Sequence, residues 1–341
     1  MTNIKPNIVL IGTGGTIAGR GDSSVNASAY DCSILPIEEI LASVEAAADI
    51  ANIGAEQLFQ MGSENFDSEQ LLTLGKRIST LLRREDVDGV VITHGTDTME
   101  ETAYFLHLTL DSDKPVVLVG SMRPPSALSS DGPLNLYNAI VVAASPQATG
   151  KGVLLVCNDE IHTARDVSKH STFKLEAFSS PYGPLGVVVE GRALFYRAPL
   201  RPHTVSSEWS IDCIEALPEV GIVYAHGGIR PATIKAMCDS GVAAIVYAAT
   251  GNGNVARQLI GSLRQARSKG IHVVRASRTG SGIVVRNGGQ PDDDYDWLAA
   301  GDQVAHKARL LMMVALSTSA AGSAQHARSD TAALQRILQE Y

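Results

Sequence analysis

The sequence is poor in cysteine, lacks histidine motifs and has no long apolar run, and each shortage excludes a class of protein. Its 4 cysteines contain no C-x-x-C pair and its 9 histidines form no H-x-H or H-E-x-x-H motif, so we expect no metal site and no dithiol redox centre. The longest apolar stretches, Val242–Ala249 and Leu310–Leu316, are far shorter than the roughly 18 to 20 residues that cross a bilayer. The sequence therefore predicts no transmembrane segment.

Positive charge is also scarce: 28 Lys and Arg stand against 36 Asp and Glu, which leaves a net charge of −8. Like charges form no long block, so neither a nucleic acid nor an anionic membrane is an expected partner, and a small soluble substrate fits better. No apolar segment with a cleavage site precedes the first strand-like run, Asn7–Ile11. We accordingly expect a cytoplasmic protein, or a periplasmic one if a signal peptide was removed before the numbering begins.

What the sequence does contain is an alternation of short β-branched runs with longer stretches in which apolar residues recur at the spacing of an α-helix. The helical stretches include Glu69–Leu82, Met99–Leu110 and Leu134–Ala144. This alternation predicts an α/β fold with a largely parallel sheet. The β-branched runs are Ile8–Ile11, Val90–Thr93, Val116–Val119, Val153–Val156, Val187–Val189, Ile222–Tyr224, Ala244–Tyr247 and His272–Val274.

The length of 341 residues, at roughly 150 residues per domain, predicts two domains. Segment 197–218 interrupts the alternation with three prolines among Ser, His and Thr, which is typical of a linker. We expect a larger N-terminal α/β domain with a mostly parallel sheet over residues 1–196. A smaller C-terminal α/β domain is expected over residues 219–341.

A glycine-rich loop, Gly12–Gly19, follows the first predicted strand, where ligands bind in open α/β sheets. The loop is not a dinucleotide fingerprint, because Ile17 occupies the place of the last glycine in G-x-G-x-x-G. Its glycines allow close approach to a ligand and leave the hydroxyls of Thr13 and Thr16 near a helix start. A ligand-binding loop and a tight turn with a threonine cap fit these residues equally well.

A second polar loop, Thr93–Thr102, follows the predicted strand that ends at Thr93. Thr98 and Glu101 have the spacing of a capping box, which gives Thr98 a structural explanation. Thr96 and Asp97 lie just outside the helix, where a hydroxyl and a carboxylate have no structural duty, so we favour a functional role for this pair.

A threonine hydroxyl is a weak nucleophile and needs a nearby base. Lys169 lies in a polar loop after the strand Val153–Val156, and a lysine can deprotonate when it is desolvated. On its own, however, such a residue is more often a solvated surface lysine than a base. Segment Gly19–Ser33, which contains Tyr30, is compatible with a mobile lid or with a plain surface loop.

Longer strings carry a more specific signal than either loop. On these strings, which extend over almost the whole chain from about Asn7, the sequence resembles the bacterial-type L-asparaginases, and more closely the glutaminase-asparaginases of that family. The strings are Gly12–Gly19, Gly62–Asn65, Ile92–Leu106, Lys114–Pro124, Ser130–Ala139, Arg165–Lys169, Tyr182–Gly186, Gly251–Asn254 and Lys307–Leu316.

The resemblance implies a covalent reaction at a threonine. In the family, the second threonine of the T-G-G-T-I-A-G string attacks the side-chain amide, which makes Thr16 the implied nucleophile. The lid tyrosine that assists it corresponds to Tyr30. The family's threonine, aspartate and lysine group corresponds to Thr96, Asp97 and Lys169, so the resemblance implies that Lys169 is a general base.

The resemblance also implies the residues that bind the substrate. Ser63 corresponds to the serine that binds the substrate's α-carboxylate. Thr96 and Asp97 are also implied to bind the substrate. Glu64 is implied to anchor the α-ammonium, and a glutamate there is typical of members that also accept glutamine. Asn254 corresponds to a residue that the neighbouring subunit supplies to the site.

Two departures from the family pattern concern cysteine and glutamate. The disulfide of some secreted members has no counterpart, which agrees with a reducing compartment. The neighbouring subunit's glutamate, which contacts the substrate amine in the glutaminase-asparaginases, corresponds to Gly289. Gln290 or one of the three residues 292–294, all Asp, is left open as its replacement.

The implied function is the hydrolysis of L-asparagine to L-aspartate and ammonia, with L-glutamine as a second substrate and no cofactor. The implied assembly is a homotetramer whose sites are shared between chains. A non-catalytic amino-acid-binding or sensing protein on the same scaffold stays open as an alternative. A subunit of a tRNA-dependent transamidation enzyme ranks last, because it would need additional N-terminal sequence.

Overall fold

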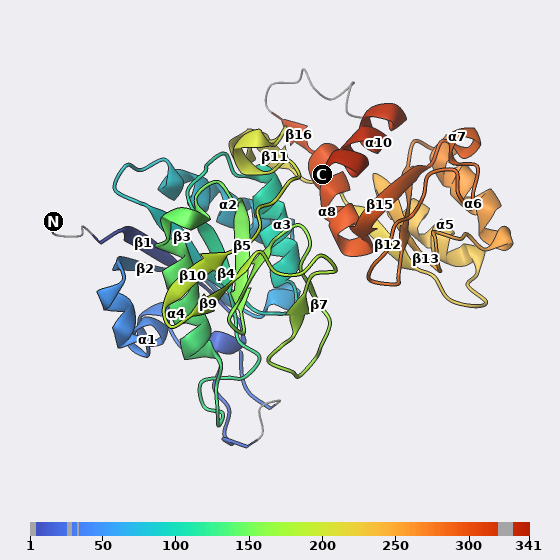
Figure 1. Cartoon of the computed structure of the whole chain (residues 1–341). Coiled ribbons are helices and arrows are strands. Elements are labelled where there is room, and N and C mark those ends of the chain that lie inside the picture. Colours follow the sequence, from blue (N-terminus) through green and yellow to red (C-terminus); the bar gives the residue numbers. More distant parts are fainter. Residues whose placement is uncertain (1–4, 26–28, 33, 320–329) are drawn as a thin grey trace. The chain divides into compact units, whose positions relative to one another are not determined.

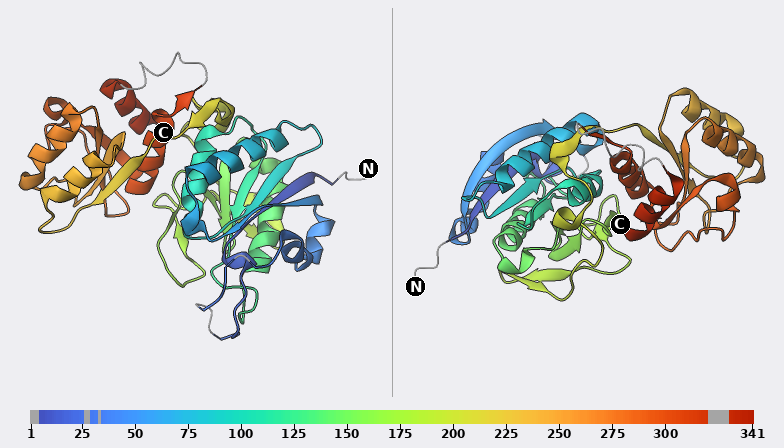
Figure 2. Two further views of the ribbon diagram at one scale, coloured as in Figure 1. Left: turned by 180° about the vertical axis from the view of Figure 1, so that it is seen from behind. Right: turned by 90° about the horizontal axis from the view of Figure 1, so that it is seen from above.

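The computed structural model describes residues 5–25, 29–32, 34–319 and 330–341. The chain divides into two compact units, Met1–Asp212 and Cys213–Tyr341 (Figures 1 and 2). The predicted linker, 197–218, contains this division together with two short 3-10 turns and a strand, β11 (Ile214–Ala216). Both units are α/β.

Among the described residues of the N-terminal unit, eight strands form one sheet in the order β10-β9-β6-β5-β4-β3-β1-β2. The five strands from β5 to β2 in this order are parallel, and β6, β9 and β10 continue the sheet by antiparallel pairing. The mostly parallel sheet that we predicted is therefore confirmed. The strands are β1 (Asn7–Gly14), β2 (Asn52–Met61), β3 (Gly89–Thr93), β4 (Val116–Val119), β5 (Val153–Cys157), β6 (Glu160–Thr163), β9 (Gly186–Val189) and β10 (Arg192–Phe195).

Helices cover both faces of this sheet, which explains why every residue of the central strands β3, β4 and β5 is buried. Alternate residues of the strands pack with α1 (Ile37–Ala42) and α4 (Gly132–Ala143) in one apolar cluster. The other helices, α2 (Ser68–Leu82) and α3 (Met99–Thr109), contact each other and strands β3, β4 and β5. A separate two-stranded ribbon pairs β7 (Ser168–Lys169) with β8 (Phe178–Ser179).

In the C-terminal unit, a parallel sheet has the order β12-β13-β14-β15, and Trp297 lies fully buried in its core. Within the described ranges, no helix of the chain is both long and apolar enough to cross a membrane. The elements are β12 (Val220–Tyr224), β13 (Ala244–Ala249), β14 (His272–Ser277), β15 (Leu298–Val304), β16 (Thr318–Ser319, paired with β11), α5 (Pro231–Asp239), α6 (Arg257–Ser268), α7 (Asp292–Tyr295), α8 (Ala305–Ala315) and α10 (Thr331–Glu340).

Candidate active site

The two polar loops singled out in the sequence lie together in the N-terminal unit. Strands β1 and β3 are parallel neighbours with Gly12 opposite Thr93, so the loops that follow them meet at one edge of the sheet. The fully buried Thr13 donates its hydroxyl hydrogen to the carbonyl oxygen of Thr93 at 2.7 Å. A Cβ at Gly15, whose φ is 85°, would overlap the backbone of Gly95. Thr13 and Gly15 therefore hold the two loops in direct contact.

Thr16 lies just beyond this contact, in the 3-10 turn Thr16–Ala18. No side chain caps this turn, so the threonine-cap explanation of the loop is wrong. The nearly buried hydroxyl of Thr16 is 2.7 Å from the phenol oxygen of Tyr30. Tyr30 belongs to the segment compared above with a lid, of which residues 26–28 and 33 lie outside the described residues.

Burial is the largest cause that raises the pKa of Tyr30, and the hydrogen bond with Thr16 opposes it. The negative charges of Asp97 and Glu64 raise the same pKa further. Both charges also raise the pKa of the Cys32 thiol, after burial as the main cause. The phenol of Tyr30 is therefore protonated near neutral pH, and two carboxylates surround the same space.

The lysine reaches the second loop. The Nζ atom of Lys169 donates to the hydroxyl oxygen of Thr96 at 2.9 Å and lies 2.6 Å from a carboxylate oxygen of Asp97. The Lys169 side chain is only 17% exposed, because β7 carries it toward these partners. The reading of Lys169 as a solvated surface lysine is therefore wrong, and the structure brings Thr96, Asp97 and Lys169 into one cluster.

Thr98 does not form the capping box that its spacing predicts. It occupies the N-cap of α3 without a side-chain capping bond. Its hydroxyl instead donates to the carbonyl oxygen of Ser63 at 2.7 Å, and its backbone N–H donates to Ser63 Oγ at 3.2 Å. A long-range partner thus replaces the local one, and sequence spacing alone could not have found it.

These hydrogen bonds place Ser63 beside the loop that contains Thr96 and Asp97. Ser63 is 2% exposed, and a Cβ at Gly95 would lie 2.6 Å from its Oγ. The next residue, Glu64, is exposed and accepts a hydrogen bond from the side chain of Asn65 at 2.9 Å. The predicted residues Thr16, Tyr30, Ser63, Glu64, Thr96, Asp97 and Lys169 therefore surround one site in the N-terminal unit.

The remaining predicted residue, Asn254, belongs to the C-terminal unit. A Cβ at Gly289 would lie 2.8 Å from the Asn254 side-chain oxygen, and Gly289 does not have a positive φ. The two positions that the resemblance assigns to the neighbouring subunit are thus adjacent within this unit.

Among the residues that the structure describes, no group of three or more His, Cys, Asp or Glu could hold a metal ion.

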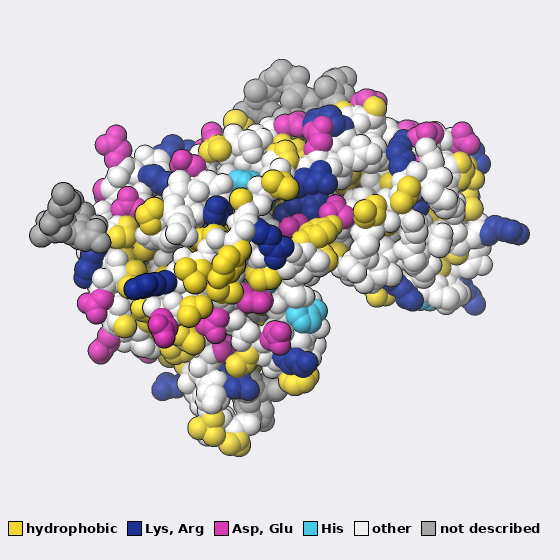
Figure 3. All heavy atoms as spheres, viewed as in Figure 1, with side chains coloured by type: hydrophobic (Ala, Val, Ile, Leu, Met, Phe, Trp, Pro, Cys, Tyr) yellow, Lys and Arg dark blue, Asp and Glu magenta, His cyan; other side chains and the backbone are white. Residues whose placement is uncertain are grey.

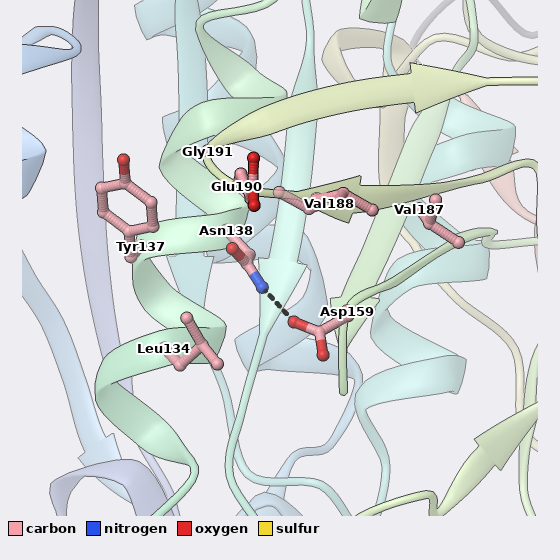
Figure 4. Close-up of a pocket in the computed structure, with 9 residues that line it drawn as sticks. Leu134, Tyr137, Asn138, Asp159, Val187, Val188, Glu190 and Gly191 are labelled. Carbon is pink, nitrogen blue, oxygen red and sulfur yellow. Dashed lines mark hydrogen bonds between the residues drawn. The ribbon is translucent and has the colours of Figure 1, made fainter.

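A surface pocket of about 670 Å³ lies between α4 and the turn from β9 to β10 (Figure 4). There Asn138 donates to Asp159 at 2.8 Å, and none of the predicted site residues lines the pocket. On the face that Figure 3 presents, acidic and basic side chains are interspersed.

Comparison with known proteins identifies the family. The family "Asparaginase, N-terminal" matches residues 7–201, and "Glutaminase/Asparaginase C-terminal domain" matches residues 219–327. The glutaminase-asparaginase of Pseudomonas fluorescens biotype A is 48% identical over 336 residues, which cover 98% of this chain and 90% of that protein. L-asparaginase 2 of Escherichia coli K12 is 41% identical over 337 residues, which cover 98% of this chain and 93% of that protein.

The fold is shared with solved structures of the same family. One of them, "Probable Cytoplasmic L-asparaginase from Campylobacter jejuni", superposes with a TM-score of 0.93 at 39% sequence identity and covers 99% of this chain and 100% of that one. The matched regions include every residue of the site described above. The resemblance inferred from the sequence strings is thus confirmed, and the chain belongs to the glutaminase/asparaginase family.

Proposed function

We propose that this protein is an amidohydrolase that releases ammonia from L-asparagine to give L-aspartate, with L-glutamine as a second substrate. The observation that carries the proposal is the pairing of two threonine hydroxyls on adjacent loops, Thr16 with the phenol of Tyr30 and Thr96 with the Nζ atom of Lys169. The names of the relatives, glutaminase-asparaginase and L-asparaginase, support the same chemistry. An ammonia assay with both amino acids tests the proposal.

The proposed reaction has two covalent steps. The Oγ atom of Thr16 attacks the side-chain amide carbon of the substrate and gives up its hydroxyl proton. That proton passes to the amide nitrogen, which leaves as ammonia when the C–N bond breaks. Water then attacks the resulting ester. Lys169, acting through its amine lone pair and with Thr96, accepts a proton from the water, and this proton returns to Thr16 Oγ as the ester bond breaks. The Gly15 N–H already donates to the carbonyl oxygen of Met61 at 3.1 Å, so the other donors of the Gly14–Thr16 loop, together with donors of the Thr96 loop, stabilise the oxyanion in both steps.

The substrate's charged end is bound by groups next to the reacting hydroxyls. Ser63 Oγ accepts a hydrogen bond from the Thr98 N–H, so its own O–H can donate to the α-carboxylate. Glu64 and Asp97 provide two negative charges for the α-ammonium. This arrangement fixes the amino acid by its backbone end and leaves the side-chain amide to meet Thr16.

Glu64 is the residue that we propose allows glutamine to serve as a substrate. We expect Glu64→Gln to lower kcat/KM for glutamine more than for asparagine, because the longer substrate depends more on the amine anchor to hold its amide at Thr16. Steady-state kinetics on both amino acids measure the difference, and Glu69→Gln, an exposed glutamate in the first turn of α2, is the control. Equal losses on both substrates would show that Glu64 is only a shared amine anchor.

We further propose a homotetramer in which the catalytic loops of the N-terminal domain, residues 1–196, are completed by the C-terminal domain, residues 219–341, of a neighbouring chain. Asn254 is the proposed contribution. The cytoplasm is the proposed location, since all four cysteines are free thiols and the Campylobacter relative is named cytoplasmic. A relative from Haemophilus influenzae is named periplasmic, so both locations occur in the family.

The contacts within the C-terminal unit narrow the candidates that could replace the glutamate missing at Gly289. Asp292 is fully buried in an ion pair with Arg275 at 2.5 Å. Asp293 pairs with Arg286 at 2.6 Å and accepts a hydrogen bond from Asn287. Both carboxylates are therefore committed within their own chain, which leaves Gln290 and Asp294 as candidates.

If neither of these reaches the substrate amine, Gly289→Glu should lower KM by about tenfold to a hundredfold, the range of one hydrogen bond to a charged group. The decrease should be larger for glutamine than for asparagine. The backbone permits the change, because Gly289 has no positive φ, although the Asn254 side chain must shift to admit a Cβ. Kinetics on the folded variant measure the effect. An unchanged KM for both amino acids would mean that the neighbour's carboxylate is already replaced or not needed.

A further inference from the structure

The first turn of α3 contains a nearly buried carboxylate that the proposed mechanism does not use. Glu100 is only 7% exposed, although an ionised carboxylate is rarely buried without a partner. One of its carboxylate oxygens accepts a hydrogen bond from the backbone N–H of Lys169. The sequence gives no hint of this bond, because 69 positions separate the two residues.

The geometry of the β7–β8 ribbon explains why this N–H needs an outside acceptor. Successive N–H groups of a strand point to opposite sides, and the N–H of His170 donates across the ribbon to the carbonyl oxygen of Ala177 at 2.8 Å. The N–H of Lys169 therefore points away from β8, where the ribbon provides no acceptor. Glu100 supplies one, and the hydrogen bond fixes the backbone at the position of Lys169.

The other end of the same lysine is held by the same segment of chain. Its Nζ atom lies 2.9 Å from Thr96 Oγ1 and 2.6 Å from Asp97 Oδ1. A lysine side chain has a flexible four-carbon stem, so its charged end is well placed only if the backbone from which it starts is also fixed. The five residues from 96 to 100 thus hold Lys169 at both ends.

We propose that Glu100 is a positioning residue for the base of the reaction: through the Lys169 N–H, it sets the place of Lys169 Nζ against Thr96 and Asp97. The proposal rests on the proposed function, in which Lys169 is the base. A carboxylate in a first helical turn also stabilises its helix through the helix dipole. The test must therefore separate positioning from helix stability.

Glu100→Gln and Glu100→Ala make that separation. The glutamine keeps a carbonyl oxygen that accepts the Lys169 N–H, so its kcat should stay within about threefold of the parent protein. The alanine removes the acceptor, and a displacement of the base of about 1 Å should lower kcat tenfold to a hundredfold while KM changes little. Glu69→Ala removes an exposed first-turn glutamate from α2 and controls for the helix dipole.

A double-mutant cycle with Lys169→Met gives the decisive readout. If Glu100 acts through Lys169, Glu100→Ala should cause no further loss of kcat once Lys169 is methionine. A further tenfold loss in that background would overturn the positioning proposal, as would a Glu100→Gln protein as impaired as the alanine variant. The glutamine arm keeps the proposal testable if the alanine protein does not fold. If Lys169→Met alone leaves ammonia release intact, the base assignment in the proposed function fails instead.

Discussion

Thr16→Ala is expected to lower ammonia release from L-asparagine by about four to six orders of magnitude, the loss that follows removal of a nucleophile. The reason is that the alanine has no oxygen to form the bond to the amide carbon. The fold should persist, because the substitution removes one methyl and one hydroxyl next to Tyr30 and introduces no new polar group. Turnover and thermal unfolding of the purified variant measure the two expectations.

Thr16→Ser is the matched variant for this experiment, because it keeps the hydroxyl and loses only the methyl group. We expect it to retain a measurable fraction of the parent activity. Near-normal ammonia release from the alanine variant would contradict the assignment of Thr16 as nucleophile. A loss confined to a misfolded protein would be recognised from its unfolding curve.

Lys169→Met should lower kcat by about a hundredfold to ten-thousandfold, the usual contribution of a general base, with a smaller effect on KM. Methionine preserves much of the apolar stem of Lys169 but cannot donate to Thr96 or accept a proton. A base acts in the transition state, so its loss should appear in kcat rather than in ground-state binding.

The control for this prediction is Lys174→Met in the same β7–β8 hairpin, where the lysine is exposed. It should leave both kinetic constants unchanged within error. If Lys169→Met raised KM alone, Lys169 would be a substrate anchor and not the base.

The fold could be predicted because its signals are local. Most of the buried strands, such as β3 and β4, are short β-branched runs, and helical periodicity separates the runs, so fold class and sheet type follow from the pattern. Strand β15 (Leu298–Val304) is not such a run, and the pattern did not predict it. The location of the loops after Ile11 and Thr93 at the carboxyl edge of the sheet was predictable as well, because both follow strands of a parallel sheet. That β1 and β3 are neighbours, so that these two loops meet, comes from the structure.

The contacts between distant segments could not be predicted in this way. The spacing of Thr98 and Glu101 fits a capping box, but the Thr98 hydroxyl instead donates a hydrogen bond to the carbonyl oxygen of Ser63, 35 positions earlier. The loop position of Lys169 by itself favours a surface lysine, and only the resemblance grouped it with Thr96, which its Nζ atom contacts in the structure. In both cases the partner comes from another part of the chain, and local spacing does not specify it.

The C-terminal unit gives a further example. The sequence alone left Gln290 and three aspartates as replacements for the glutamate absent at Gly289, and nothing in the spacing of the aspartates distinguishes them. Two of them are bound to Arg275 and Arg286, which lie 17 positions before Asp292 and 7 before Asp293. Burial and pairing, rather than chain position, decide which carboxylates remain candidates.

The measurement that tests the central claim most directly is the release of ammonia by the purified full-length chain, supplied separately with L-asparagine and L-glutamine. The account predicts many turnovers per chain, with aspartate or glutamate formed in amounts equal to the ammonia. Saturable binding of L-asparagine in a calorimeter without release of ammonia would contradict it, and would identify the chain as a non-catalytic amino-acid-binding protein.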